Sequence, residues 1–260
     1  MSWASRRRVA YATGVIVFFA VLFGVPLSYW YFTLPETCID GIQNQDETGV
    51  DKGGICPVLD ESALQPHASL WARSFRVRDG SYNAAAYIQN PNQNAGVAVA
   101  HYRFGLYDAQ NILIAEREGS MFIMPGSITP VLESRIDAGN SIVGRTYFEF
   151  MEPLKWERMK NNALPLAVTN KEITNTFAAP RLTAIARNSS VAPIADISFV
   201  AVIFDPAGNA FAASATTLSR LGADESSEIV FTWPDPFAIQ SGRIDIIPLV
   251  APTVVPVAQH

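Results

Sequence analysis

The stretch "VAVAHYRFGLYDAQN", residues 97–111, carries the clearest structural signal in the chain. Its side chains alternate in steps of two, which is typical of a β-strand with one face in a core and the other in solvent. The buried face is expected to hold Ala98, Ala100, Tyr102, Phe104 and Leu106, and the open face Val99, His101, Arg103 and Gly105. A turn then follows at residues 108–111. The stretch therefore predicts a strand of a β-sandwich.

The same pattern returns 97 or 98 residues later. Asn188 corresponds to Asn90, Asp205 to Asp108, and Gly242 to Gly144. The turn "MPGS" at 124–127 corresponds to "LGAD" at 221–224. The second buried face is expected to hold Ala195, Ile197, Phe199, Ala201 and Ile203. We therefore predict a mainly β fold with two tandem immunoglobulin-like β-sandwich domains, each of roughly 95 residues.

The N-terminal segment has the composition of a membrane-spanning helix. From Val9 to Phe32 there are twenty-four residues without a charge, which as a helix would span roughly 36 Å. Arg6, Arg7 and Arg8 precede it, so we expect a cytoplasmic N-terminus. The run is longer than the apolar part of a signal peptide, and no small-residue cleavage site follows it. We expect an uncleaved, single-pass signal anchor with the later residues outside the cytoplasm.

These observations give an expected order of parts along the chain. It consists of a cytoplasmic tail (1–8), a transmembrane helix (9–32), an acidic stalk (33–62), a first β-sandwich domain (63–152), a linker (153–165) and a second domain with a C-terminal tail (166–260). The linker is charged and lacks strand alternation, so it is expected to form a short helical turn or an ordered connection.

The segment "FGLYD" at 104–108 resembles the signature of FxLYD-type domains, which are small β-sandwiches of bacterial and archaeal envelope proteins. Asn90, Pro125 and Gly126 match the turn and hairpin positions of that family. The second copy departs from the pattern, with "AVIFD" at 201–205. The resemblance implies a β-sandwich fold and a place in the cell envelope, and it brings no assigned chemistry.

The chain has two cysteines, and they bracket the stretch "CIDGIQNQDETGVDKGGIC" at 38–56. From its residues alone it could be a metal site, a disulfide-closed spacer or the remnant of a larger segment. It resembles the segment "CxDGxxNxxExGxDCGGxCxxC" of bacterial surface proteins, but Lys52 and Leu59 stand where that pattern has cysteines. The resemblance implies that one disulfide has been lost as a pair and that Cys38 and Cys56 form the other.

The same stretch is rich in oxygen ligands of the kind that calcium prefers. These are Asp40, Asn44, Asp46, Glu47 and Asp51. Calcium takes six to eight oxygens, but the spacing is not that of an EF-hand, and Lys52 adds a positive charge beside the set. Calcium is therefore the one cofactor that the sequence suggests, and a solvated acidic turn is the alternative.

The remaining residues offer little material for catalysis. There are three histidines, and the common nucleophile, metalloprotease and phosphate-loop motifs do not occur. The net charge is −5, which gives no basic footprint for nucleic acid. His101 and Arg103, together with Arg76 and Arg78, could form a cationic face for an anionic sugar or polymer, or an ordinary solvated sheet face.

The expected function is therefore structural or interaction-based rather than enzymatic. A membrane-anchored envelope protein with this organisation would serve in adhesion, in scaffolding or in binding a surface polymer. A calcium- or glycan-binding module is the alternative. No residue identifies the envelope protein or polymer that it would contact.

Overall fold

The computed structural model describes residues 3–32, 38–44, 46–54, 56–159 and 164–251. The chain divides into two compact units, Met1–Cys56 and Pro57–His260. The first contains the helix and the cysteine-bounded loop. The second contains the strands and is called the β unit below. The predicted C-terminal tail lies largely outside the described residues.

Helix α1 (Trp3–Phe32) begins earlier than the predicted span of 9–32. Arginine is a good helix former, so nothing in residues 3–8 stops the helix before its apolar part. The stretch Arg7–Trp30 is long and apolar enough to cross a membrane, and none of it is buried within the protein. Pro26 lies inside the helix near its C-terminal end. This helix fits the predicted signal anchor in length and composition.

The β unit begins with a short 3₁₀ turn, η1 (Glu61–Ala63), and continues as antiparallel strands. The strands are β1 (Ala68–Arg78), β2 (Ser81–Gln89), β3 (Ala95–Tyr107), β4 (Leu113–Ile123), β5 (Ile128–Asp137), β6 (Arg145–Phe150), β7 (Glu157–Arg158), β8 (Leu166–Thr174), β9 (Arg181–Asn188), β10 (Ile194–Phe204), β11 (Ala210–Leu221), β12 (Ser226–Thr232) and β13 (Arg243–Leu249). The predicted mainly β fold is confirmed.

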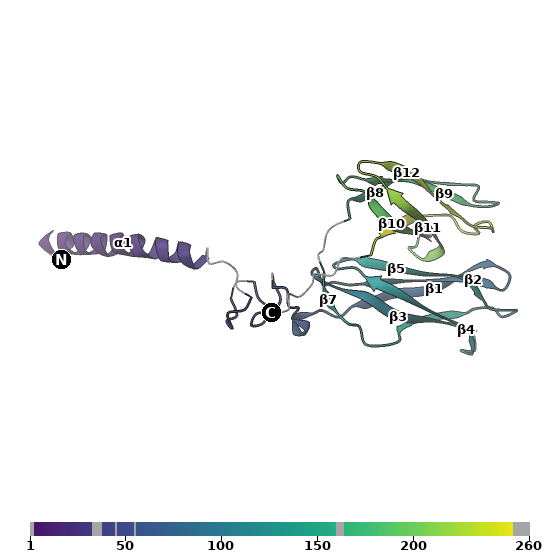
Figure 1. The fold of residues 1–260 in the computed structure, drawn as a ribbon, viewed down its shortest axis with the longest axis horizontal. Helices are drawn as coiled ribbons and strands as arrows, with labels where there is room; N and C mark the ends of the chain where they lie inside the picture. The colour runs from purple at the N-terminus through teal and green to yellow at the C-terminus, as the bar shows by residue number, and fades with distance from the viewer. Residues whose placement is uncertain (1–2, 33–37, 45, 55, 160–163, 252–260) are drawn as a thin grey trace. The chain divides into compact units, whose positions relative to one another are not determined.

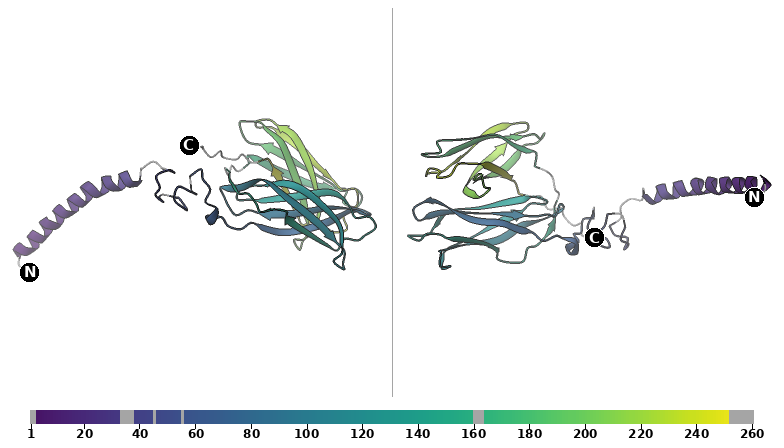
Figure 2. Two further views of the ribbon diagram at one scale, coloured as in Figure 1. Left: turned by 60° about the horizontal axis from the view of Figure 1, so that its bottom comes forward. Right: turned by 180° about the vertical axis from the view of Figure 1, so that it is seen from behind.

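The described strands form four sheets, which the views of the β unit show as layers (Figures 1 and 2). Their strand orders are β4–β3–β6, β1–β2–β5, β11–β10–β13 and β12–β9–β8. The short strand β7 pairs with the start of β3, at Ala95 and Gly96. Residues 157–158 of the predicted linker are thus in a sheet, and residues 160–163 lie outside the described part.

Two hydrophobic cores lie between pairs of sheets. In the first, Tyr102, Phe104 and Leu106 of β3 pack with residues of β2 such as Ala86 and Ile88. In the second, β10 and β9 supply the residues at the centre, which include Ile197, Phe199, Ala201, Ile203, Leu182 and Ala184. The sequence predicted most of the core-facing residues of β3 and β10. Ala195 was also predicted to face the core, but it is exposed, because the next residue, Asp196, has a left-handed backbone conformation (φ 51°) that breaks the two-residue step before Ile197. Alternation in steps of two therefore located both cores.

A third cluster joins the two sheet pairs. It packs residues of β2, such as Ala85 and Tyr87, against Val200, Val202 and Phe204 of β10. Both middle strands are therefore buried on both faces, whereas the sequence predicted a single buried face for the stretch around 195–203. The reason is that the unbroken apolar run "FVAVIF" at 199–204 belongs to a strand covered on both sides, as in a sheet between two layers.

A bulge changes the alternation near the start of β3. The pairing with β4 shifts between Val97 and Ala100, so both of these side chains are buried. Val99 is 59% exposed, as predicted. Ala98 was predicted to face the core, but it is only half-buried because the extra residue of the bulge breaks the two-residue step.

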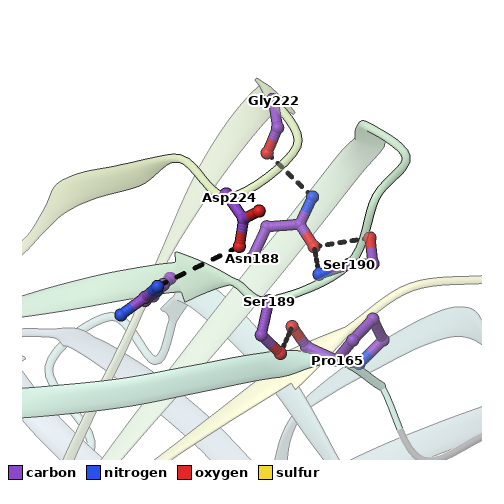
Figure 3. Close-up of polar contacts among 7 residues, drawn as sticks. Pro165, Asn188, Ser189, Ser190, Gly222 and Asp224 are labelled. Carbon is purple, nitrogen blue, oxygen red and sulfur yellow. Dashed lines mark hydrogen bonds and ion pairs between the residues drawn. The ribbon is translucent and has the colours of Figure 1, made fainter.

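The turns that the sequence matched make the same hydrogen bonds in both halves. The buried Asn188 side chain donates to the Gly222 carbonyl at 2.8 Å and accepts from the Ser190 backbone at 2.9 Å (Figure 3). It also donates to the carbonyls of Ala192 at 2.8 Å and Leu221 at 3.3 Å. Asn90 likewise donates to two carbonyls, of Ala95 and Met124, and accepts from the backbone N–H two residues later. A buried side chain with this many partners fixes the turn that carries it.

The correspondence extends to the other end of the strands. The Gly144 N–H donates to the Tyr107 carbonyl at 2.8 Å, and the Gly242 N–H donates to the Phe204 carbonyl at 2.7 Å. A side chain at either glycine would collide with the neighbouring turn, because a Cβ at these positions would lie 3.0 Å or less from its backbone. The two glycines, 98 residues apart, therefore have the same local hydrogen bonding and the same close approach to a turn.

Candidate binding site

The outer face of the β4–β3–β6 sheet carries the binding residues that the sequence singled out. Arg103 lies in the middle strand, directly opposite Glu118 of β4 and Glu149 of β6. His101 lies one step along the same face, opposite Ser120, and is exposed. The structure therefore brings His101 and Arg103 together on one exposed face, as alternation predicts.

The charge of Arg103 is balanced by its neighbours on this face. Its Nε donates to Glu149 Oε1 at 3.0 Å, and its guanidinium lies 3.4 Å from Glu116 Oε1. The hydrogen bond with Glu149 raises the pKa of Arg103, and the charges of Glu116, Glu149 and Glu118 act in the same direction. This face therefore mixes positive and negative groups.

The other two predicted members of the cationic face lie elsewhere. Arg76 and Arg78 belong to β1, in the β1–β2–β5 sheet, and Arg76 forms an ion pair with Asp79. They are not on the sheet that carries Arg103. Sequence alternation within a strand assigns its two faces, but it does not show which strands share a sheet, and that is why the four residues were grouped.

The histidine before the strands packs against the first core rather than forming a site. The His67 ring lies 5.3 Å from that of Phe150 and 6.2 Å from that of Trp156, measured between ring centroids. Burial lowers the pKa of His67. The third histidine, His260, lies outside the described residues. His67 therefore adds no group to the outer face that carries His101 and Arg103.

A hollow of about 320 Å³ lies over Gly105 on the same outer face. The absence of a side chain there lets the Tyr107 ring fold over the strand, because a Cβ at Gly105 would come within 2.8 Å of that ring. The Tyr107 and Tyr147 rings meet edge to face, with centroids 5.2 Å apart. Polar groups from Asn111 and Glu116 also line the hollow.

Sequence patterns did not identify Tyr107, Tyr147 or Asn111 as site residues. A usable signal was present, because a glycine inside a strand often marks a place where another group approaches the backbone closely. Gly105 is such a glycine, and it stands beside Tyr107 in "FGLYD".

The chemistry of this hollow suits a sugar. Tyr147 is 50% exposed and offers an apolar ring face with a polar tip. Carboxylates accept hydrogen bonds from hydroxyl groups, and guanidinium and amide groups donate to them. Glu149, Arg103 and Asn111 place these groups around the rings. An aromatic surface bordered by fixed polar groups can hold a pyranose ring and its hydroxyls.

The cysteine-bounded loop contains the predicted disulfide, Cys38–Cys56, which spans 18 positions. No other cysteine exists, so the chain has no free thiol. Glu47 lies near both sulfurs, and such a cluster could bind a metal if the thiols were free. The sulfurs are joined to each other, however, so neither can act as a thiolate ligand.

Most of the predicted calcium ligands hold the loop's own backbone. Asp51 accepts from the N–H groups of Asp40 and Gly41, and buried Glu47 accepts from those of Asn44 and Asp51. Asp40 accepts from the Asn44 side-chain amide at 2.9 Å. These carboxylates therefore already have a structural role, which the sequence did not indicate.

One oxygen of the predicted set has no such role. Oδ1 of Asn44 is buried and accepts no hydrogen bond from the part of the chain that the structure describes. Asp46 is exposed to solvent. Calcium binding by this loop remains a prediction. An increase in melting temperature with millimolar calcium, and not with magnesium, would support it.

Comparisons with known proteins give little guidance. No protein-family model matches the chain, and no curated protein matches its sequence. Among solved structures, red sea bream transglutaminase is similar with a TM-score of 0.24 and 10% sequence identity. The match covers 70% of this chain and spans 29% of the transglutaminase chain. A similarity at this level carries no argument about function.

Proposed function

We propose that this protein is a single-pass, membrane-anchored binding protein of a bacterial cell envelope, without catalytic activity. The observation that carries the proposal is helix α1, in which the predominantly apolar stretch Arg7–Trp30 is long enough to span a membrane and is exposed throughout. Apolar surface of this extent is stable in a lipid bilayer and not in water. The Cys38–Cys56 disulfide supports an extracytoplasmic position for the rest, since disulfides persist in oxidising compartments.

In this proposal the β unit consists of two tandem immunoglobulin-like β-sandwich domains. The support is the repeat of hydrogen bonds around Asn90 and Asn188, and around Gly144 and Gly242. Each proposed domain has its own hydrophobic core between two sheets. Such domains commonly serve as rigid platforms whose surfaces bind a partner.

The partner in this proposal is a glycan of the envelope, bound at the Gly105 hollow. The favouring observation is the exposed Tyr147 ring, which stands against Tyr107 and beside Glu149 and Arg103. The alternative role, a scaffold that contacts another envelope protein through the same face, uses the same residues. Binding of purified glycan distinguishes the two.

The orientation is tested by adding a protease to intact spheroplasts that carry the full-length protein with a C-terminal tag. We expect loss of the tag, and a smaller loss in a variant whose Arg6, Arg7 and Arg8 are replaced by Glu, since the positive charge that keeps the N-terminus in the cytoplasm is then removed. Detergent lysis gives the cleavage control. If residues 60–260 are protected in intact spheroplasts, the proposed orientation is wrong.

The glycan is tested with the full-length protein in detergent and with glycan isolated from the envelope of the expressing cells. We expect retardation in an affinity gel that contains the glycan, and loss of that retardation in Tyr147→Ala. Phe177→Ala is the matched control, because Phe177 is an aromatic residue that is 91% exposed and lies outside the hollow. Equal retardation of Tyr147→Ala and wild type would rule out the hollow as the glycan site.

A further inference from the structure

A second depression, of about 560 Å³, lies beside the hollow on the flank of the β unit. It is lined by parts of three strands, with Arg73 and Arg76 from β1, Arg145 and Tyr147 from β6, and the start of β11. Each of these strands is at the end of its sheet, so each has one side without a neighbouring strand among the described residues. Three layers therefore expose their edges to one groove.

The groove collects positive charge. Its described lining includes the guanidinium groups of Arg73, Arg76 and Arg145 and no acidic residue. Two acidic groups act on these arginines from outside the lining: Asp79 forms an ion pair with Arg76, and the charge of Asp205 interacts with Arg73. Arg145 is exposed and forms no ion pair with any residue that the structure describes. This contrasts with the outer face, where glutamates surround Arg103.

Arg73 is held in place across the groove. Its two terminal nitrogens donate to the Ala210 carbonyl at 3.3 Å and to Asn209 Oδ1 at 3.2 Å. A guanidinium group has five N–H donors, so these contacts leave donors for an anion. The side chain is therefore oriented before a ligand arrives, which lowers the entropy cost of binding.

Tyr147 joins this groove to the Gly105 hollow, because it lines both depressions. A linear ligand with one ring against Tyr147 can therefore continue around the edge of β6 toward Arg145 and Arg73. The groove adds hydroxyl groups from Ser74 and Thr146 to its lining. The surface thus presents an aromatic ring first and then cations and hydroxyl groups. A chain of sugars that carries carboxylate or other anionic groups is complementary to this arrangement.

We propose that the ligand is an acidic polysaccharide, with one sugar ring at Tyr147 and a neighbouring carboxylate bound by Arg145 and Arg73. The inference rests on the proposed glycan binding and names its chemical class. A carboxylate accepts charge-assisted hydrogen bonds from guanidinium groups, and these are stronger than hydrogen bonds between neutral groups.

The test compares polygalacturonate with its fully methyl-esterified form, which has the same sugar backbone without the charge. The full-length protein in detergent is titrated with each polymer by calorimetry. We expect the acid form to bind more tightly, and Arg145→Gln to weaken its binding by about tenfold, the loss of one charge-assisted hydrogen bond. Binding should also weaken with added salt.

Two variants separate the site from general charge. Arg187→Gln removes an exposed arginine on β9, outside the groove, and should leave the affinity unchanged. Arg73→Lys keeps the charge but not the planar donor pair, so it should weaken binding less than Arg73→Gln. Folding of each variant is checked by its thermal transition.

The outcomes distinguish this inference from the function on which it rests. Equal binding of acid and ester, with loss in Tyr147→Ala, would overturn the acidic class and leave glycan binding standing. Binding of polyglutamate as tight as that of polygalacturonate, with equal loss in Arg145→Gln, would show a site for any polyanion and overturn the inference. Absence of binding to both sugar polymers would also overturn it, and the envelope-glycan gel then decides the proposed function separately.

Discussion

Strands β3 and β10 occupy corresponding positions in the proposed repeat, but one face of each strand has different surroundings: solvent in β3 and a second sheet in β10. Their core faces correspond, with Phe104 and Leu106 in β3 and Ala201 and Ile203 in β10. Their other faces do not. Arg103 and Gly105 of β3 lie on the outer surface, whereas the matched Val200 and Val202 of β10 are buried against the β1–β2–β5 sheet.

Alternation in the sequence therefore predicts the core-facing side of each strand. Whether the opposite side is buried depends on which sheet packs against it. In β10 that face meets Tyr87 and Trp71, whose rings lie about the Phe204 ring at centroid distances of 6.2 Å. In β3 the residue matched to Phe204 is Tyr107, and it borders the proposed glycan site. Corresponding strand positions thus pack against a neighbouring sheet in one half and border the proposed binding site in the other.

Val200 of β10 corresponds to Arg103 of β3, and placing an arginine at position 200 should destabilise the protein more than any other change considered below. Val200→Arg places a charge without a partner between two sheets, and we expect a loss of about 3–5 kcal/mol in the free energy of unfolding. Arg103→Val should change the free energy of unfolding far less, because exposed ion pairs contribute little to stability. Urea unfolding of both variants measures the contrast.

Val200→Ala serves as the control, since it removes volume without adding charge. A Val200→Arg variant as stable as Val200→Ala would mean that the third hydrophobic cluster is open to water in solution. The comparison between β3 and β10 would then be wrong in its main point.

The two buried asparagines should give equal effects if the halves are equivalent. Asn90→Ala and Asn188→Ala each leave carbonyls and a backbone N–H without their side-chain partner, and we expect each to cost about 2–3 kcal/mol. Denaturant unfolding measures the loss. Asn94→Ala, at an exposed position on the same turn, should have little effect. A loss confined to one of the two buried positions would contradict the proposed repeat.

A smaller change in stability is expected at the turns that follow the two strands. Hydrogen bonds from the Asn209 backbone and side chain hold the pKa of Asp205 below its ordinary value of 3.8. Because the pKa is lower in the folded state than in the unfolded state, the ionised aspartate stabilises the folded protein when the pH is above 3.8. This stabilisation is lost as the pH falls through the folded-state pKa. Asp205→Ala should therefore lower the urea midpoint at pH 7 slightly, and the difference from wild type should shrink below pH 3.8.

Asp205→Asn is the matched control for that measurement, because its amide oxygen can still accept the backbone hydrogen bond but does not titrate. The corresponding turn after β3 uses Asp108, whose Oδ1 accepts from the N–H groups of Gln110 and Ile112. Asp108→Ala should lower the midpoint at pH 7 by a similar amount. An unchanged midpoint in both alanine variants would show that these turns do not depend on their aspartates.

Much of the fold could be predicted because local pattern and tertiary packing agree. The apolar run of α1, the core faces of β3 and β10, and the turns at Asn90 and Asn188 all follow from periodicity and turn chemistry. The bulge at Ala98 could not be predicted, since it inserts one residue without changing composition.

The candidate site was only partly predictable. His101 and Arg103 lie on the expected face. The turn at 108–111 connects β3 to β4, but no local pattern connects β3 to β6, which supplies Glu149, the hydrogen-bond partner of Arg103. The groove beyond Tyr147 depends on three strand edges meeting. Such a surface depends on the order of strands in the sheets and on how the sheets pack. Neither can be predicted from local patterns in a single sequence.

The layer order has a further consequence for how many domains can stack. The sheet of β10 matches the sheet of β3, yet it packs on the sheet of β2, so the proposed domains are related head to tail rather than by a two-fold axis. A head-to-tail contact does not close on itself and can in principle be extended. Here the terminal sheets present charged residues, with Arg103 and Glu149 on one side and Arg187 and Glu228 on the other. Charged residues on both terminal sheets disfavour the burial of those faces against a further sheet, as polar terminal repeats do in solenoid proteins.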